Sequence, residues 1–154
     1  GGGMASRLFQ SIREERGLAY SVYAAAESYA GTGVLAAYIG TDGEDALEAV
    51  QLLRGEIESA ARGMRDDELS RARAMLKSMR LMSLESPASR IELAAGQLFT
   101  FGEILTPEYV CGRLDALTLD DLKRCAGHAL GAAPPSLAVV GPADFGGLQK
   151  AIGL

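Results

Sequence analysis

Histidine and cysteine most often carry metal or nucleophilic chemistry, and this sequence has very few of them. His128 is the one histidine in 154 residues, and Cys111 and Cys125 stand fourteen positions apart without a second cysteine pair. A zinc site built on two or three histidines would therefore need ligands from outside this chain. The cysteines fit no zinc-finger spacing, so we interpret them as reduced, buried thiols.

Three further patterns could do chemistry, but each has a simpler explanation. A Ser-His-Asp triad would have to use His128, and no serine stands in a nucleophile-elbow sequence. The run Gly1–Gly3 ahead of a helix could bind an anion, but no dinucleotide or P-loop glycine pattern accompanies it, so a turn or close packing is favoured. The acidic pairs fall at predicted helix ends or solvated faces, where dipole and solubility roles explain them: Glu14–Glu15, Asp66–Asp67 and Asp120–Asp121.

The segment Arg13–Tyr20 combines a different set of groups. It joins the cationic end of a predicted helix, through Gly17, to the aromatic start of a predicted strand. By residue type alone, Arg13 is a solvated cation at a helix end and Tyr20 is an aromatic packed on a sheet face. These structural interpretations are favoured when the residues are taken without further information.

The composition is that of a globular domain that does not bind nucleic acid. Hydrophobic residues make up 48% and charged residues 23% of the chain, which is ordinary for a protein with one core. The net charge is −5, and no run of Lys or Arg is long enough to follow a phosphate backbone. No apolar stretch reaches the roughly 20 residues needed to span a bilayer. We predict a single domain over residues 1–154 without a membrane span.

The elements that would position Arg13 and Tyr20 are a helix and a hairpin. Apolar residues at helical spacing predict a short helix over residues 4–16 that ends at Gly17. Runs rich in Tyr, Val and Ala over 18–29 and 34–39, separated by Ala30–Gly33, predict an antiparallel hairpin. The run Ser136–Val140 predicts a third strand that returns to the same sheet.

Helix-start signals account for most of the remaining sequence. Thr41-Asp42-Gly43-Glu44 matches the T-x-x-E capping box and predicts a helix from Thr41 to Gly63. Further helices are predicted over 66–85, from Ser86-Pro87 onward, over 107–116 and over 119–130. The predicted fold class is α+β, with a mainly antiparallel sheet of about three strands covered by about five helices.

Several stretches resemble the second homologous domain of the pitrilysin/insulinase family of zinc endopeptidases. The likeness is nearest to the mitochondrial processing peptidase branch and its bacterial relatives, and it covers nearly the whole chain. The signature-like stretch is Gly1–Phe9 followed by Ile12–Tyr23. Weaker pieces are Gly40-Thr41, residues 67–73 with Lys77, residues 82–86 with Ser89-Arg90, and residues 137–142.

The resemblance implies one half of a two-domain clamshell peptidase with ferredoxin-like elements. Zinc would be bound through an H-x-x-E-H motif of the first domain or of a partner chain, not by this chain. Arg13 and Tyr20 match, by position, an arginine and a tyrosine with which such second domains reach the bound peptide. By this likeness Arg13 would hold a peptide carbonyl, and Tyr20 would donate to the oxyanion of the transition state. The nearby Arg16, Tyr23 and Tyr29 are expected to be structural.

The sequence also departs from the family pattern. Arg65 stands where relatives tend to place a capping threonine, which puts that cap in doubt. Such domains normally carry a strand and a helix before the triple glycine, so we expect the chain to be truncated at its N-terminus.

The resemblance predicts the substrate-clamping C-terminal domain of a zinc metalloendopeptidase that hydrolyses extended or unfolded peptides and is inactive alone. Its partners would be the peptide and a zinc-bearing N-terminal domain or partner subunit, with a homodimer as a further alternative. The main alternative function is a non-catalytic scaffold or assembly subunit, like the core proteins of respiratory complexes. A third is a free-standing α+β domain that binds peptides without metal. The bacterial cytoplasm is the favoured compartment, with the periplasm and the mitochondrial matrix as alternatives.

Overall fold

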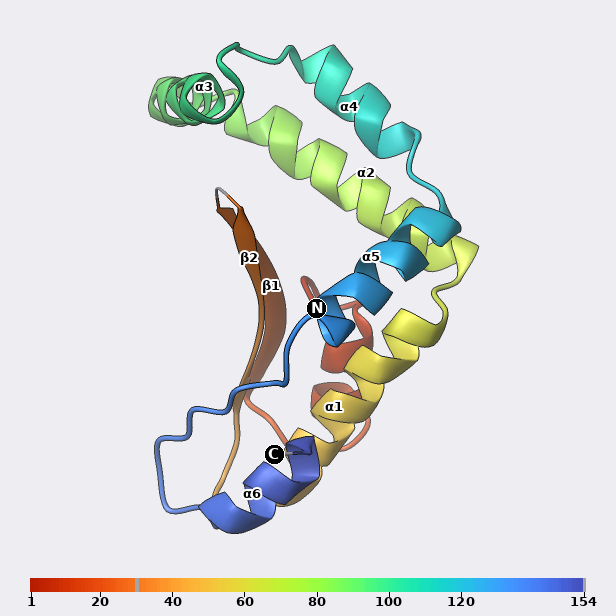
Figure 1. Ribbon diagram of the computed structural model, residues 1–154, viewed down its shortest axis with the longest axis vertical. Helices are drawn as coiled ribbons and strands as arrows, with labels where there is room; N and C mark the ends of the chain where they lie inside the picture. The colour runs from red at the N-terminus through yellow and green to blue at the C-terminus, as the bar shows by residue number, and fades with distance from the viewer. Residues whose placement is uncertain (30, 154) are drawn as a thin grey trace. The chain divides into compact units, whose positions relative to one another are not determined.

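Figure 1 shows a computed structural model of the chain, which describes residues 1–29 and 31–153. These residues form an antiparallel hairpin and a series of helices, so the predicted α+β class is confirmed. The chain divides into two units, of which the first contains Gly1–Arg62 with Cys125–Leu154 and the second contains Gly63–Arg124. The single domain over residues 1–154 stays a prediction.

The hairpin of the first unit is the predicted one. Strands β1 (Ser21–Tyr29) and β2 (Thr32–Gly40) pair antiparallel, with Ser21 opposite Gly40 and Tyr29 opposite Thr32, and Figure 1 shows them as one bent ribbon. Gly31 has a φ of 79°, which a residue without a side chain adopts at little cost. The predicted separation Ala30–Gly33 is too long, because Thr32 and Gly33 already belong to β2, and Ala30 lies outside the described residues.

The helix ahead of the hairpin is shorter and wider than predicted. It is the π-helix η1 (Phe9–Glu14), not an α-helix over residues 4–16. Its wider turn is visible where the Glu15 N–H donates to the carbonyl of Gln10, five residues earlier, at 2.9 Å. Apolar spacing cannot distinguish the two helix types over so few residues. Single π-turns occur frequently at functional sites.

The predicted third strand does not form. The described residues contain a two-stranded sheet of β1 and β2 only, and Ser136–Val140 forms neither a strand nor a helix. Leu137 and Val139 are half-buried and pack on a cluster of Ala46, Val50 and Leu148. The alternating apolar pattern was therefore real, but it serves packing against helices and not pairing in the sheet.

That cluster joins two helices, one of which begins later than predicted and one of which was not predicted. Helix α1 (Ala46–Arg62) begins at Ala46 because Thr41 does not cap it. The Thr41 hydroxyl instead donates to the Leu18 carbonyl at 2.5 Å, tying the end of the hairpin to its start. Helix α6 (Phe145–Ile152) begins after Asp144, whose carboxylate accepts from the Gly146 N–H at 3.1 Å. Its Leu148 is almost fully buried.

The second unit is helical, and its helix starts agree with the sequence. It holds α2 (Asp66–Ser83), α3 (Pro87–Phe101), α4 (Pro107–Asp115) and the beginning of α5 (Leu119–Gly131). Ser86, Thr106 and Thr118 each accept a backbone N–H as predicted caps. At Arg65 half of a capping box is present, because Glu68 accepts from the Arg65 N–H at 2.8 Å. Lys77 of α2 and Asp115 of α4 form an ion pair at 2.7 Å.

The start of α5 should make the stability of the fold change with pH in the acidic range. The hydroxyl and the N–H of Thr118, followed by Arg124, hold the pKa of Asp121 below its ordinary value of 3.8. Because the folded-state pKa is the lower one, this stabilisation is complete above the unfolded-state pKa and is lost as pH falls through the folded-state pKa. We expect Asp121→Asn to flatten the acid limb of a plot of unfolding midpoint against pH. Asp120→Asn keeps the cap, so an equal flattening in that variant would contradict the assignment.

Candidate functional site

A glycine turn places the end of η1 beside the start of β1. Gly17 has a φ of 66°, and its N–H donates to the Arg13 carbonyl at 3.1 Å. The N–H of Leu18 then donates to the Ile12 carbonyl at 3.0 Å, and that of Tyr20 donates to the Gly40 carbonyl at 2.9 Å. The backbone between the helix and the hairpin is therefore held at both ends, which brings positions 13 and 20 together.

Buried neighbours determine which way the two candidate side chains face. Ile12 is fully buried and Ala19 is 6% exposed, and both belong to a core cluster with Leu8 and Val22. Arg13 and Tyr20 directly follow these two core residues in the sequence. Arg13 and Tyr20 are themselves exposed, Tyr20 to 88%, so the buried neighbours anchor the backbone while both candidates face outward.

Arg13 lies against two aromatic rings. Its guanidinium carbon is 4.7 Å from the centre of the Phe9 ring and 5.8 Å from the centre of the Tyr20 ring. A cation within about 6 Å of a ring centre is attracted to the ring face, by about 0.5–1 kcal/mol at exposed sites. The contacts orient the guanidinium without using its N–H groups.

The polar atoms of this pair are available to a ligand. Over residues 1–29 and 31–153, no hydrogen bond or ion pair is recorded for the Arg13 side chain or the Tyr20 hydroxyl. A planar fork of donors and a single phenol donor thus stand close together on an exposed surface. Such donors can hold a carbonyl oxygen or stabilise negative charge that develops on one.

The three neighbouring residues expected to be structural each have a partner within the chain. Arg16 forms an ion pair with Glu48 of α1 at 2.9 Å. Tyr23 stacks on Tyr38 of the facing strand, with ring centres 5.2 Å apart. Tyr29 donates from its hydroxyl to Glu27, which raises the pKa of the tyrosine. Of these arginine and tyrosine side chains, only Arg13 and Tyr20 contact each other across the glycine turn.

Phe9 belongs to this site, although the sequence analysis did not include it. It stands four residues before Arg13, a spacing that places two side chains on the same side of a helix. That spacing was the available signal, but an aromatic residue at the start of an amphipathic helix is more often a core residue. Phe9 is half-buried, so part of its ring packs while a face supports the guanidinium.

The described residues do not fit a zinc site. No group of three or more His, Cys, Asp or Glu side chains in residues 1–29 and 31–153 is arranged to hold a metal ion. Cys111 is half-buried and free, and Cys125 is free and exposed, so the prediction of buried thiols is wrong for Cys125.

In residues 1–29 and 31–153, no helix combines the length and apolar character that crossing a bilayer requires.

Gly17 offers a direct test of the turn that brings Arg13 and Tyr20 together. A Cβ at position 17 would meet nothing within 4 Å, so Gly17→Ala changes only the backbone preference. We expect a loss of about 1–2 kcal/mol in the free energy of unfolding, because a φ of 66° is unfavourable for alanine.

Gly55→Ala is the matched control for that variant. Gly55 lies within α1, and a Cβ there also meets nothing within 4 Å. This change should stabilise the chain by about 0.5–1 kcal/mol. Denaturant unfolding would measure both variants, and a Gly17→Ala chain as stable as the Gly55→Ala chain would contradict the assigned turn.

Comparison with protein families identifies the part of the chain that carries this site. Residues 1–76 match the family described as the peptidase M16 inactive domain. The matched range contains η1, both strands and α1, and so includes Arg13, Gly17 and Tyr20.

Relatives found by sequence match most of this chain, but the match covers only part of their own length. A Streptomyces coelicolor protein named an uncharacterized zinc protease is 35% identical over 92% of this chain and 31% of the relative. A Rickettsia felis protein of the same description is 34% identical over 96% of this chain and 35% of the relative. A Bacillus subtilis protein named uncharacterized zinc protease YmxG is 32% identical over 78% of this chain and 30% of the relative. The chain spans about a third of the length of the relatives named first.

Solved structures share the fold. The structure of a conserved protein from Enterococcus faecalis V583 matches this chain with a TM-score of 0.70 and 28% sequence identity. The match covers 82% of this chain and 29% of the Enterococcus chain. A chain of complex III from Candida albicans matches 80% of this chain with a TM-score of 0.71, but at 18% identity it shows the fold alone. The match over residues 1–76 and the relatives named as zinc proteases show that the chain belongs to the pitrilysin/insulinase-type peptidase M16 family, with residues 1–76 matching its inactive, C-terminal domain.

Proposed function

We propose that this chain is the substrate-clamping domain of a zinc metalloendopeptidase whose zinc is bound outside residues 1–154. The observation that carries the proposal is the exposed pair of Arg13 and Tyr20, which lies across the Gly17 turn with its donors free for a ligand. The names of the relatives as zinc proteases support peptide hydrolysis as the activity of the whole protein.

In this proposal the two side chains act at different stages. Arg13 binds a carbonyl of an extended peptide through its fork of N–H donors, and this contact exists from the first encounter. Tyr20 donates its hydroxyl hydrogen to the oxygen that becomes negative as the peptide bond is attacked. That hydrogen bond strengthens with the developing charge, so it lowers the barrier more than it improves substrate binding.

An exposed apolar surface on the hairpin supports a partner domain. Val34 and Tyr38, which lie on the same face of β2, are each about half exposed, and an isolated two-stranded hairpin is only marginally stable in water. A zinc-bearing domain or subunit would both cover this surface and supply the metal. A location in the bacterial cytoplasm, peptides as substrates and a homodimer stay predictions.

Reconstitution tests the proposal. The chain is mixed with its zinc-bearing half, and cleavage of unstructured peptides is measured for the mixture and for each component. Cleavage should require both components. Full cleavage by the zinc-bearing half alone would overturn the clamping role.

The second candidate is a non-catalytic assembly subunit. The structural likeness to a chain of complex III fits this role but does not favour it, since at 18% identity the likeness concerns the fold. A partner sequence without an H-x-x-E-H motif, together with a stable complex that cleaves no peptide, would favour the assembly role. An intact motif with cleavage would favour the peptidase.

A further inference from the structure

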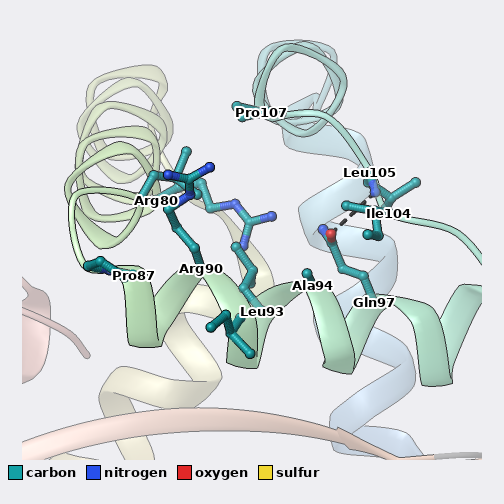
Figure 2. Close-up of a pocket in the computed structure, with 11 residues that line it drawn as sticks. Arg80, Pro87, Arg90, Leu93, Ala94, Gln97, Ile104, Leu105 and Pro107 are labelled. Carbon is teal, nitrogen blue, oxygen red and sulfur yellow. Dashed lines mark hydrogen bonds between the residues drawn. The ribbon is translucent and has the colours of Figure 1, made fainter.

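A pocket of about 630 Å³ lies in the second unit, to which Arg13 and Tyr20 do not belong. The end of α2, helix α3 and the segment leading into α4 form it, as Figure 2 shows. Its volume is within the range of about 300–1,000 Å³ that is typical of small-ligand sites. Most of the wall is apolar: Leu84, Ile91, Leu93, Ala94, Ile104 and Leu105.

Two arginines give this apolar pocket a positive charge. Arg80 comes from α2 and Arg90 from α3, and no acidic side chain lines the pocket. In Figure 2 both lie toward one side of the pocket, and Gln97, Ile104 and Leu105 lie toward the other. The charge and the apolar wall therefore belong to one cavity.

Neither guanidinium has a partner in the described part of the chain. The Nε atom of Arg80 is buried and has no hydrogen-bond partner there. Neither the Arg80 nor the Arg90 side chain has a recorded ion pair or hydrogen bond in residues 1–29 and 31–153. A buried donor without an acceptor is costly, and a guanidinium is best satisfied by two oxygens of one anion.

The opposite side of the pocket is held in place. Gln97 is 8% exposed, and its Oε1 accepts from the Leu105 N–H at 3.2 Å. This bond fixes the segment with Ile104 and Leu105 against α3, so the apolar wall is formed before any ligand binds.

We propose that this pocket binds an apolar chain that ends in a single carboxylate. Arg80 and Arg90 hold the carboxylate oxygens, and the apolar wall covers the carbon chain. A free phosphate would use the charge but leave the wall uncovered, and an uncharged hydrocarbon would leave the guanidinium groups unpaired. Two sources share this chemistry: the free carboxyl end of a peptide with apolar side chains, and a fatty acid.

Calorimetric titration of the chain with matched probes tests the proposal. The peptide probes are acetyl-Ala-Leu-Leu with a free carboxyl end and its C-terminal amide, and the lipid probes are decanoate and decanol. For at least one pair, we expect the acid to bind at least tenfold more tightly than its neutral partner. The pair that shows this difference identifies the source.

Three arginine variants assign the binding to the pocket. Arg80→Gln and Arg90→Gln should each weaken binding of the acid at least tenfold. Arg113→Gln removes the same charge from an exposed position on α4 outside the pocket, and should leave binding unchanged. Far-ultraviolet circular dichroism checks that each variant is folded, and Arg90, which is exposed, carries the test if Arg80→Gln unfolds the chain.

Several results would overturn the assignment. One is equal binding of acid and neutral probes, and another is the absence of binding by either acid at millimolar concentration. Inorganic phosphate binding as tightly as the acids would show that the apolar wall has no role. Equal losses in the Arg113→Gln and Arg90→Gln chains would show a general charge effect.

Discussion

Tyr20→Phe, in the protein assembled with a zinc-bearing half, is expected to lower kcat about 10²- to 10³-fold with little change in KM, as removal of an oxyanion donor does. The substitution removes one hydroxyl from a side chain that is 88% exposed and makes no other recorded hydrogen bond within residues 1–29 and 31–153, so the fold should be unaffected. The bond to the substrate strengthens only as charge develops, which is why the loss appears in kcat. Steady-state kinetics on an unstructured peptide would measure it.

Tyr29→Phe is the matched control for this variant. Tyr29 is 59% exposed and lies at the far end of β1, where its hydroxyl donates to Glu27. Its replacement should leave kcat and KM close to those of the unchanged protein. A Tyr20→Phe enzyme with full turnover, or an equal loss in both variants, would remove Tyr20 from the proposed chemistry.

Arg13→Ala should weaken peptide binding about 10- to 100-fold, the range expected for loss of a hydrogen bond from a charged group. A smaller fall in kcat should accompany it, because the Arg13 guanidinium lies 5.8 Å from the centre of the Tyr20 ring and helps to orient it. Binding of an uncleaved peptide analogue and the kinetics of a cleaved peptide would separate the two effects.

Two variants determine whether charge or geometry at position 13 matters. Arg13→Lys keeps the cation but loses the planar fork, so we expect it to restore only part of the affinity. Arg16→Ala removes a nearby arginine whose ion pair with Glu48 is exposed, and exposed pairs contribute little. Wild-type affinity in Arg13→Ala, or a comparable loss in Arg16→Ala, would contradict a direct contact between Arg13 and the peptide.

The sequence predicted those parts of the fold that depend on local signals. The hairpin, the caps at Ser86, Thr106 and Thr118, and the long helix α2 follow from residues within a few positions of each other. Helix α6 carried a similar signal that was missed, since Asp144 precedes apolar residues at helical spacing. Errors arose where tertiary contacts decided the outcome.

Two of those errors show the competing contacts. The T-x-x-E pattern at Thr41 was a sound local signal, but the hydroxyl satisfies the Leu18 carbonyl, which is distant in sequence. Ser136–Val140 had the composition of a strand, yet its alternating apolar side chains pack on α1 and α6. In both segments, a contact with residues far along the chain determined the local structure, and the local sequence pattern did not.

The candidate site was predictable in part. The spacing of Arg13 and Tyr20 was recognised from the family resemblance, but side-chain type and spacing favoured structural roles for both residues. The exposed placement of the pair and the support from Phe9 depend on the π-helix and on the left-handed backbone conformation of Gly17. The spacing of apolar residues reveals neither of these two features. The pocket of Arg80 and Arg90 had no local signal, because two helices contribute one arginine each.

Photocrosslinking from position 20 tests most directly whether this side chain contacts the peptide. Tyr20 is replaced by p-benzoylphenylalanine in the protein assembled with its zinc-bearing half, and Tyr29 is replaced likewise as the control. On illumination with an unstructured peptide, position 20 should crosslink to the peptide and position 29 should not. A peptide that is bound by the assembled protein but never crosslinks to position 20, or crosslinks equally to both positions, would contradict the account.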